Sequence, residues 1–235
     1  MPEPTTGSGV TIRRAADRFH TKAGWLDSWH TFSFGEHHDP AHMGYRQLRV
    51  INDDIVAPGQ GFGMHPHRSM EIFTYIISGQ LEHKDSMGNG RVIGAGEFQY
   101  MSAGDGVLHS EFNPSDTEPV QLLQIWITPK HPGGEPRYQD LDTKPLRREN
   151  GLTLLASGDG RDGSIAIRQD AEIHFGHLDA GAGLRIDPPH TWLHLIAGEV
   201  GIGAATLAPG DGAAIDGPAD LASSSRSEFL LFRLP

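Results

Sequence analysis

Two short segments of the chain carry pairs of side chains of the kind that bind metal ions. His65 and His67 are two residues apart, and so are His109 and Glu111. On a β-strand, residues at i and i+2 point to the same face about 6.5–7 Å apart, so both can reach one ion through bonds of about 2.0–2.2 Å. If the two strands are neighbours, three imidazoles and one carboxylate can surround one divalent cation. Imidazole ligands favour Fe, Mn, Ni, Cu or Zn over Mg or Ca.

The two pairs together carry more weight than either pair alone. The chain holds 14 His, so a His-x-His pair is expected by chance about once in such a sequence. The second pair follows about 40 residues later, beyond a hairpin signal. Glu71, four residues after His67, lies about 13 Å from it along a strand and cannot share its ion. We therefore expect Glu71 to act beside the ligands or in a pocket.

The other candidate histidines have spacings that do not suit ligation. They alternate between the faces of a strand, lie too far apart along it, or stand in a loop-like stretch. These residues are His37, His38, His174, His177, His190 and His194. The second half of the chain is therefore expected to hold no metal.

Short strands must position these side chains, because no long segment keeps the apolar period of a helix. Runs rich in β-branched and aromatic residues, bounded by Gly or Pro, predict strands in both halves of the chain. They are Gln47–Ile51, Met70–Ile77, Glu97–Met101, Val107–Phe112, Val120–Ile127, Leu152–Ala156, Ile165–Gln169, Glu172–Leu178, Trp192–Ile196, Glu199–Gly203 and Phe229–Leu234. An Asn89-Gly90 pair predicts a hairpin. Many short strands at regular spacing indicate an all-β sandwich or barrel.

A segment poor in apolar residues separates the two strand-rich halves. Pro129–Asn150 gathers Pro and Gly beside charged residues, as linkers do. We therefore expect a first domain at 1–133, a linker at 134–150 and a second domain at 151–235. The second half looks like a weaker copy of the first. The aromatic side chains near the start are expected in the core rather than in a substrate platform. They are Trp25, Trp29, Phe32 and Phe34.

Composition argues against several classes of function. Lys+Arg 19 against Asp+Glu 30 gives a formal charge of −11, so the chain has no basic footprint for nucleic acid or an anionic membrane surface. The absence of Cys excludes disulfides, thiolate nucleophiles and cysteine-based metal sites. No apolar stretch is long enough for a membrane span, and Met1–Arg14 does not read as a signal peptide. We expect a cytoplasmic protein.

Several segments resemble a known family. Gly59–Gly79 and Gly96–Asn113 resemble the two halves of the cupin motif, with Ser102 where a Pro is usual. More specifically, the chain resembles the pirin family, and within it the bacterial pirin-like quercetin 2,3-dioxygenases, densely over about residues 10–130. The segments that carry this likeness are Gly24–Phe34, His65-Pro66-His67, Met70-Glu71, Glu82–Asn89, His109-Ser110-Glu111 and Leu123–Trp126. The C-terminal part matches mainly through Arg161–Ser164 and Phe229–Phe232.

The resemblance implies an all-β bicupin of two antiparallel β-barrel (jelly-roll, cupin) domains, with one divalent transition metal in the N-terminal barrel. The implied ligands are His65, His67, His109 and Glu111. Fe(II) is the expected metal, with Cu, Ni, Mn or Zn as alternatives. The implied reaction is dioxygenase cleavage of the heterocyclic ring of a flavonol such as quercetin with O2 and release of CO. Glu111 would also be the catalytic base for the flavonol 3-hydroxyl. We expect a monomer that contacts neither nucleic acid nor membrane directly.

Two other functions fit the same residues. The wider pirin family includes nuclear regulators, so the four ligands could form a metal- or redox-responsive centre in a protein-binding module or transcriptional cofactor. A cupin isomerase or lyase acting on another hydroxylated small molecule is the third possibility. Metal analysis and oxygen uptake with quercetin distinguish these functions.

Overall fold

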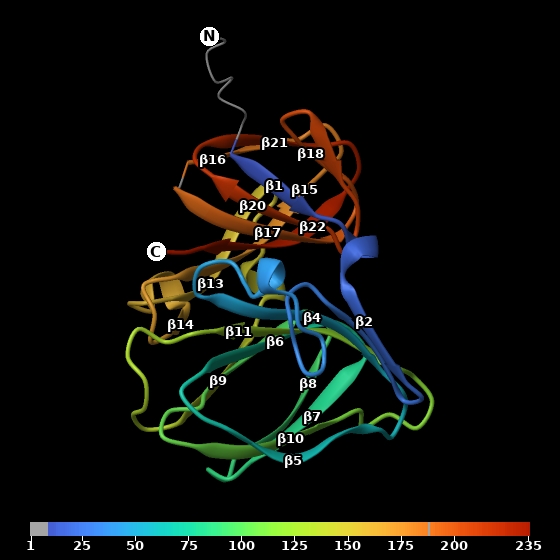
Figure 1. Cartoon of the computed structure of the whole chain (residues 1–235), viewed down its shortest axis with the longest axis vertical. Helices are drawn as coiled ribbons and strands as arrows, with labels where there is room; N and C mark the ends of the chain where they lie inside the picture. Colours follow the sequence, from blue (N-terminus) through green and yellow to red (C-terminus); the bar gives the residue numbers. More distant parts are fainter. Residues whose placement is uncertain (1–8, 188) are drawn as a thin grey trace. The chain divides into compact units, whose positions relative to one another are not determined.

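The chain is built from β-strands (Figure 1). The structure is a computed structural model that describes residues 9–187 and 189–235. Among these residues there is no α-helix, and the helical turns are short 3-10 segments. They are Ala15–Asp17, Pro40–His42, Lys144–Leu146 and Arg161–Gly163. The all-β fold class expected from the strand pattern is confirmed.

The strands follow one another closely along the chain. Those of the first half are β1 (Val10–Arg13), β2 (Phe19–Ala23), β3 (Leu26–His30), β4 (Leu48–Val56), β5 (Gly61–His67), β6 (Glu71–Ser78), β7 (Gln80–Asp85), β8 (Gly90–Gly94), β9 (Glu97–Ser102), β10 (Val107–Phe112), β11 (Val120–Ile127) and β12 (Arg137–Asp142). Those of the second half are β13 (Gly151–Ser157), β14 (Ile165–Ala166), β15 (Glu172–Leu178), β16 (Gly183–Ile186), β17 (His190–Ala197), β18 (Val200–Ile202), β19 (Ala205–Leu207), β20 (Gly212–Asp216), β21 (Ala219–Ser223) and β22 (Ser227–Arg233).

The strands form two compact units. The N-terminal unit contains Arg18–Leu146 and Leu155–Ala171, and the C-terminal unit contains the described chain up to Asp17, Arg147–Leu154 and Glu172–Pro235. This division differs from the expected boundaries at 133 and 151. The first strand, β1, belongs to the C-terminal unit because it pairs with β20 along its whole length. Such long-range pairing leaves no mark on the local sequence pattern.

The expected linker, 134–150, contains a strand. β12 pairs antiparallel with β9, from Arg137 opposite Ser102 to Asp142 opposite Glu97. It is the outermost strand of its sheet, and none of its residues is fully buried. An edge strand of this kind needs few apolar side chains, so its composition resembles that of a linker.

The N-terminal unit consists of two antiparallel sheets. The larger has the order β12-β9-β6-β11-β4-β3-β2, and the smaller has the order β5-β10-β7-β8. The predicted hairpin is present between β7 and β8, where the carboxylate of Asp85 accepts hydrogen bonds from the backbone N–H groups of Met87 and Asn89. One apolar cluster of this unit contains Val56, Ile76, Leu81, Ile93, Val120 and Leu122. The polar centre described below lies on β5 and β10 of the smaller sheet and on the facing strands of the larger one.

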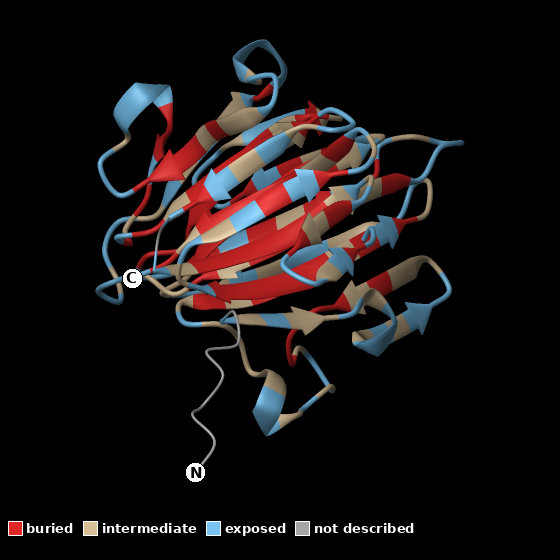
Figure 2. Ribbon diagram, turned by 90° about the horizontal axis from the view of Figure 1, so that it is seen from above, coloured by how far each residue is buried: buried red, intermediate tan, exposed pale blue. Residues whose placement is uncertain are grey.

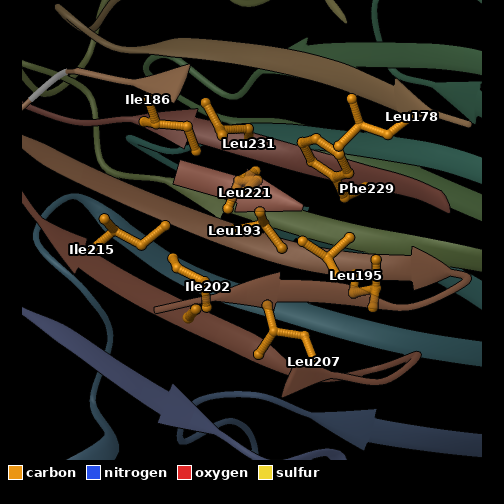
Figure 3. Packing of buried hydrophobic residues seen from close by; sticks show 12 residues of the cluster. Leu178, Ile186, Leu193, Leu195, Ile202, Leu207, Ile215, Leu221, Phe229 and Leu231 are labelled. Carbon is orange, nitrogen blue, oxygen red and sulfur yellow. The ribbon is translucent and has the colours of Figure 1, made fainter. Parts of the chain in front are cut away.

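The C-terminal unit has a similar arrangement. Its larger sheet contains β1-β20-β17-β22-β15-β13 in that order, and its smaller sheet contains β16-β21-β18-β19. Leucine, isoleucine and phenylalanine side chains fill its interior, as the labelled residues in Figure 3 show. Figure 2 shows that buried residues lie mainly along the strands and exposed residues mainly in the turns. The second half of the chain is thus a structural counterpart of the first.

Candidate metal centre

Three of the predicted ligands come together on two paired strands. β5 and β10 are antiparallel neighbours, with His109 opposite His65 and Val107 opposite His67. One ring nitrogen from each of His65, His67 and His109 lies within 4.8 Å of the others. The ring centroids are 4.4–4.8 Å apart. The i and i+2 spacing on β5 and the pairing of β5 with β10 therefore produce a cluster of three imidazoles.

Glu111 lies beside this cluster but in a second group of possible ligands. Its carboxylate lies within 4.8 Å of ring nitrogens of His109 and His83. The register of β10 against β5 shifts between His109 and Glu111, so Glu111 faces Phe62 instead of the residue that regular pairing would give. Thr74 Oγ1 donates to Glu111 Oε1 at 3.2 Å, and Gln124 Nε2 donates to Oε2 at 2.9 Å. These two bonds fix the orientation of the carboxylate.

His83 was not singled out by the sequence. It stands on β7 directly opposite Glu111 and is fully buried. Its Nε2 lies 3.2 Å from Asp85 Oδ2, and its Nδ1 lies 3.2 Å from Gln99 Nε2. Because both nitrogens have partners, His83 is less available as a ligand than the three clustered histidines. The same i and i+2 rule, applied to His83 and Asp85, would have marked the pair.

His109 has the surroundings of a metal ligand. It is 1% exposed, and neither of its ring nitrogens has a hydrogen-bond partner in the described part of the chain. Leaving such a buried polar group unsatisfied costs about 1–3 kcal/mol, which a metal bond would offset. Burial, together with the nearby His65 and His83, lowers the pKa of His109 to about 3. The imidazole is therefore neutral at physiological pH, the form that binds metals.

The two histidines of β5 are also prepared for ligation. Burial, with the nearby His109 and His65, lowers the pKa of His67 to about 4. His65 Nδ1 lies 2.7 Å from the backbone carbonyl of Gly63, so Nδ1–H donates to this oxygen and Nε2 keeps its lone pair for an ion. The set of donors fits a single transition metal.

A row of polar side chains crosses the interior face of the larger sheet beneath the cluster. Its members stand opposite one another on β3, β4, β11, β6 and β9, and cross-strand neighbours share a face. We call His30, Asn52, Gln124, Thr74 and Gln99 the polar row. Thr74 and Gln124 hold Glu111, Gln99 holds His83, and His30 bonds to Asn52 at 2.8 Å. The sheet thus supports the candidate ligands through side chains from distant parts of the sequence.

A pocket of about 90 Å³ opens beside the cluster. His65, His67 and Glu111 form part of its lining. The apolar wall consists of Leu26, Phe34, Phe62 and Trp126, and the remaining polar wall consists of Ser28, His30, Asn52, Asp54 and Gln124. The Trp126 ring packs edge-on against the rings of Phe34 and His67. Phe34 is therefore a pocket residue, although it was expected in the core, whereas Phe32 is 4% exposed and does belong to the core.

Glu71 takes neither of the two roles expected for it, beside the ligands or in a pocket. Its carboxylate is 1% exposed and belongs to neither group of possible ligands, and it does not line the pocket. It accepts hydrogen bonds from Tyr100 Oη at 2.5 Å, Ser102 Oγ at 2.6 Å and the backbone N–H of Arg168 at 2.8 Å. Glu71 instead joins β6, β9 and the segment around Arg168. Its donors come from distant positions, which explains why strand spacing excluded ligation but gave no sign of this role.

Several of the histidines set aside from the sequence have other partners. His37 Nε2 lies 3.0 Å from Thr21 Oγ1, and His174 Nε2 lies 2.8 Å from Glu172 Oε2. His190 Nδ1 lies 2.7 Å from Asp216 Oδ1. Within residues 9–187 and 189–235, both groups of possible metal ligands lie in the N-terminal unit. No helix in these ranges is long and apolar enough to cross a membrane.

Comparisons with known proteins agree with this architecture. A family model described as Pirin matches residues 10–127, and one described as Quercetinase C-terminal cupin domain matches residues 154–234. Quercetin 2,3-dioxygenase of Escherichia coli (strain K12) is 46% identical over 231 residues, covering 96% of this chain and 99% of that protein. The bacterial pirin YhhW from Escherichia coli, solved in complex with nickel(II), has a TM-score of 0.92 and 44% identity, covering 96% of this chain and 99% of that chain. The expected bicupin fold is confirmed.

Proposed function

We propose that this chain, which belongs to the pirin family, is a metal-dependent dioxygenase. It would cleave the heterocyclic ring of flavonols such as quercetin with O2 and release CO. The observation that carries the proposal is the cluster of three imidazoles, with the carboxylate of Glu111 next to one of them, beside a pocket with aromatic walls. The quercetin 2,3-dioxygenase name of the Escherichia coli relative supports it.

His65, His67, His109 and Glu111 would hold one divalent ion. Fe(II) is the first choice, followed by Cu, Ni, Mn and Zn, and the nickel(II) complex of the Escherichia coli pirin supports a transition metal of this group. Once bound, the ion would supply positive charge to stabilise the oxyanion of an ionised flavonol, and an ion other than Zn(II) would also supply the redox chemistry that dioxygen needs. His83, with both nitrogens engaged, would fix the position of its neighbours instead of binding the ion.

Glu111 would take the proton of the flavonol 3-hydroxyl. Each carboxylate oxygen has two lone pairs, and the bonds from Thr74 and Gln124 use one on each oxygen. Capacity therefore remains for an ion on one side and a proton on the other. Phe34, Phe62 and Trp126 would hold an aromatic ring and exclude water from it. A pocket of about 90 Å³ is smaller than the roughly 300–1,000 Å³ that encloses a drug-sized ligand, so one ring of the flavonol enters it.

Oxygen uptake by protein purified without air tests the proposal. Protein reconstituted separately with each of the five metals should consume quercetin and O2 in equal amounts and release CO with at least one of them. Glu111→Gln keeps the size of the side chain but cannot take the proton, so turnover should fall about 10²–10⁴-fold. Part of the rate should return at alkaline pH, where the flavonol ionises without a base.

The matched control for this experiment is His38→Ala, which replaces an exposed histidine outside the candidate centre. It should have the rate of the wild type. If the deficit of Glu111→Gln is equal at every pH while the metal is fully bound, Glu111 is a ligand but not the base. If no metal supports consumption of quercetin, the dioxygenase proposal fails, and a metal-responsive binding module becomes the better explanation of the centre.

A further inference from the structure

One wall of the pocket is polar at sheet positions that face the interior. On β3 and β4, Ser28 stands opposite Asp54 and His30 stands opposite Asn52, whereas the next pair on the same face is Leu26 with Val56. Ser28, His30, Asn52 and Asp54 all line the pocket. Their exposed fractions are 1%, 4%, 3% and 3%. Burying four polar side chains costs free energy unless hydrogen bonds satisfy them, so the bonds at this wall are informative.

Hydrogen bonds within the wall or to a neighbour engage Ser28, His30 and the amide oxygen of Asn52. Ser28 Oγ donates a short hydrogen bond to Asp54 Oδ1. The 2.8 Å contact of His30 Nδ1 with Asn52 Oδ1 requires a proton on Nδ1, and His30 Nε2 then accepts from Thr21 Oγ1 at 2.9 Å. Burial lowers the pKa of His30, in keeping with this neutral form.

The second carboxylate oxygen of Asp54 is an exception, and so is the amide nitrogen of Asn52, which makes no hydrogen bond among the described residues. No hydrogen bond to Asp54 Oδ2 occurs in the described part of the chain. A carboxyl group that is 97% buried, lines a pocket and has one oxygen without a partner is arranged to meet a polar group of a ligand.

The chemistry of the pocket indicates what that group is. Leu26, Phe34, Phe62 and Trp126 suit an aromatic ring. Two carboxyl groups, Asp54 and Glu111, oppose an anionic ligand. An aromatic ring that carries a hydroxyl satisfies both conditions, because the ring is apolar and the hydroxyl is neutral. Burial, opposed by the Ser28 bond and assisted by Asp53 and Glu111, raises the pKa of Asp54 to about 7, so this carboxyl can either donate to a hydroxyl or accept from one.

We propose that Asp54, held by Ser28, binds a phenolic hydroxyl on the ring that enters the pocket and thereby determines which hydroxylation patterns the protein accepts. This role rests on the proposed function for the identity of the substrate as a flavonol. Asp54 is distinct from the candidate metal ligands and is a recognition residue, not the base.

Flavonols that differ only in their ring hydroxyls test this role. Quercetin, kaempferol, galangin and 3-hydroxyflavone all keep the 3-hydroxyl but lose the other hydroxyls in steps. A polar site built for a hydroxyl discriminates against an analogue that lacks it, and one such bond corresponds to about 10–100-fold in kcat/KM. We expect the wild type to show a step of this size at one point in the series. Asp54→Ala should abolish the step by lowering kcat/KM only for the members that carry the recognised hydroxyl, and Asp54→Asn should reduce the step.

The matched control is Asp27→Asn, on the opposite face of the neighbouring strand β3. Asp27 Oδ1 lies 2.8 Å from His20 Nε2, and Asp27 does not line the pocket. This variant should keep the step of the wild type. If Asp54→Ala lowers kcat/KM by the same factor for all four flavonols, or for none, the proposal is overturned. The pair of flavonols between which the wild type shows the step identifies the ring that enters the pocket.

Binding measured without oxygen separates this proposal from the dioxygenase proposal. Titration of the metal-loaded protein with the four flavonols, followed by tryptophan fluorescence, should show the same Asp54-dependent step in Kd. If the step is present although no flavonol is consumed, the recognition role stands and the dioxygenase proposal fails. If flavonols are consumed and the Kd values of Asp54→Asn equal those of the wild type, the recognition role fails. Tighter Asp54-dependent binding of benzylammonium than of phenol would also overturn it, because Asp54 would then serve as a bare charge.

Discussion

At the scale of single residues, His109 differs from His83 although both are buried histidines beside Glu111. Both nitrogens of His83 have partners, whereas neither nitrogen of His109 has one among the described residues. We predict that His109→Ala lowers the metal content from close to one ion per chain to nearly none. His83→Gln should keep close to one ion, with an affinity lower by about 10-fold, because it disturbs a neighbour of the ligands and not a ligand.

Plasma mass spectrometry of each variant after dialysis against the metal measures this difference. His38→Ala, which removes an exposed histidine, serves as the control and should keep the metal content of the wild type. Loss of the ion from both His83→Gln and His109→Ala would show that the ion is held by the other group, formed by His83, His109 and Glu111. Retention of the ion in His109→Ala would contradict both groups, because His109 belongs to each.

At the scale of elements, the polar row makes β11 a support for the metal centre. Gln124 donates to Glu111 at 2.9 Å, so Gln124→Leu leaves one oxygen of a buried carboxylate without its donor. Outer partners of this kind are worth about 10–100-fold in metal affinity. We predict that Gln124→Leu weakens metal binding by about this factor, while the stoichiometry at saturating metal stays at one.

The chain provides a close control on the same strand. Gln121 also donates to a carboxylate, Asp53, at 2.9 Å, but it faces away from the pocket. Gln121→Leu should leave the metal affinity unchanged in competition titrations with a chelator. An equal loss of affinity in the two variants would mean that the effect comes from general destabilisation of β11 and not from the bond to Glu111.

The strands of the metal centre show which features of the site could be predicted from the sequence and which could not. The cluster of three imidazoles was predicted because side-chain direction along a strand depends on local spacing alone. His65 and His67 share a face of one strand, and that strand pairs with the one that carries His109. The polar row was not predicted, because Asn52, Gln124 and Thr74 meet only through the register of three strands. Register between distant strands depends on tertiary packing, which a local pattern does not record.

At the scale of the whole molecule, the stability of the metal-free protein is expected to depend on the pH because His109 is buried. In the unfolded chain, His109 takes up a proton below a pH of about 6.5, whereas in the folded protein burial and nearby histidines lower its pKa to about 3. Protonation between these values therefore favours the unfolded state. The contribution of His109 to stability is fully present above about pH 6.5 and is lost progressively as the pH falls toward 3.

We predict that the free energy of unfolding of the metal-free N-terminal unit falls by a few kcal/mol between about pH 6.5 and pH 4. Urea unfolding in the presence of a chelator, at several pH values, measures this slope. His109→Gln cannot take up the proton, so its slope should be shallower than that of the wild type, whereas His38→Gln at the surface should keep the wild-type slope. Saturating metal should stabilise the wild type most at neutral pH, because ligands must be deprotonated to bind. If His109→Gln has the same slope as the wild type, the buried neutral state of His109 does not contribute to the stability of the unit.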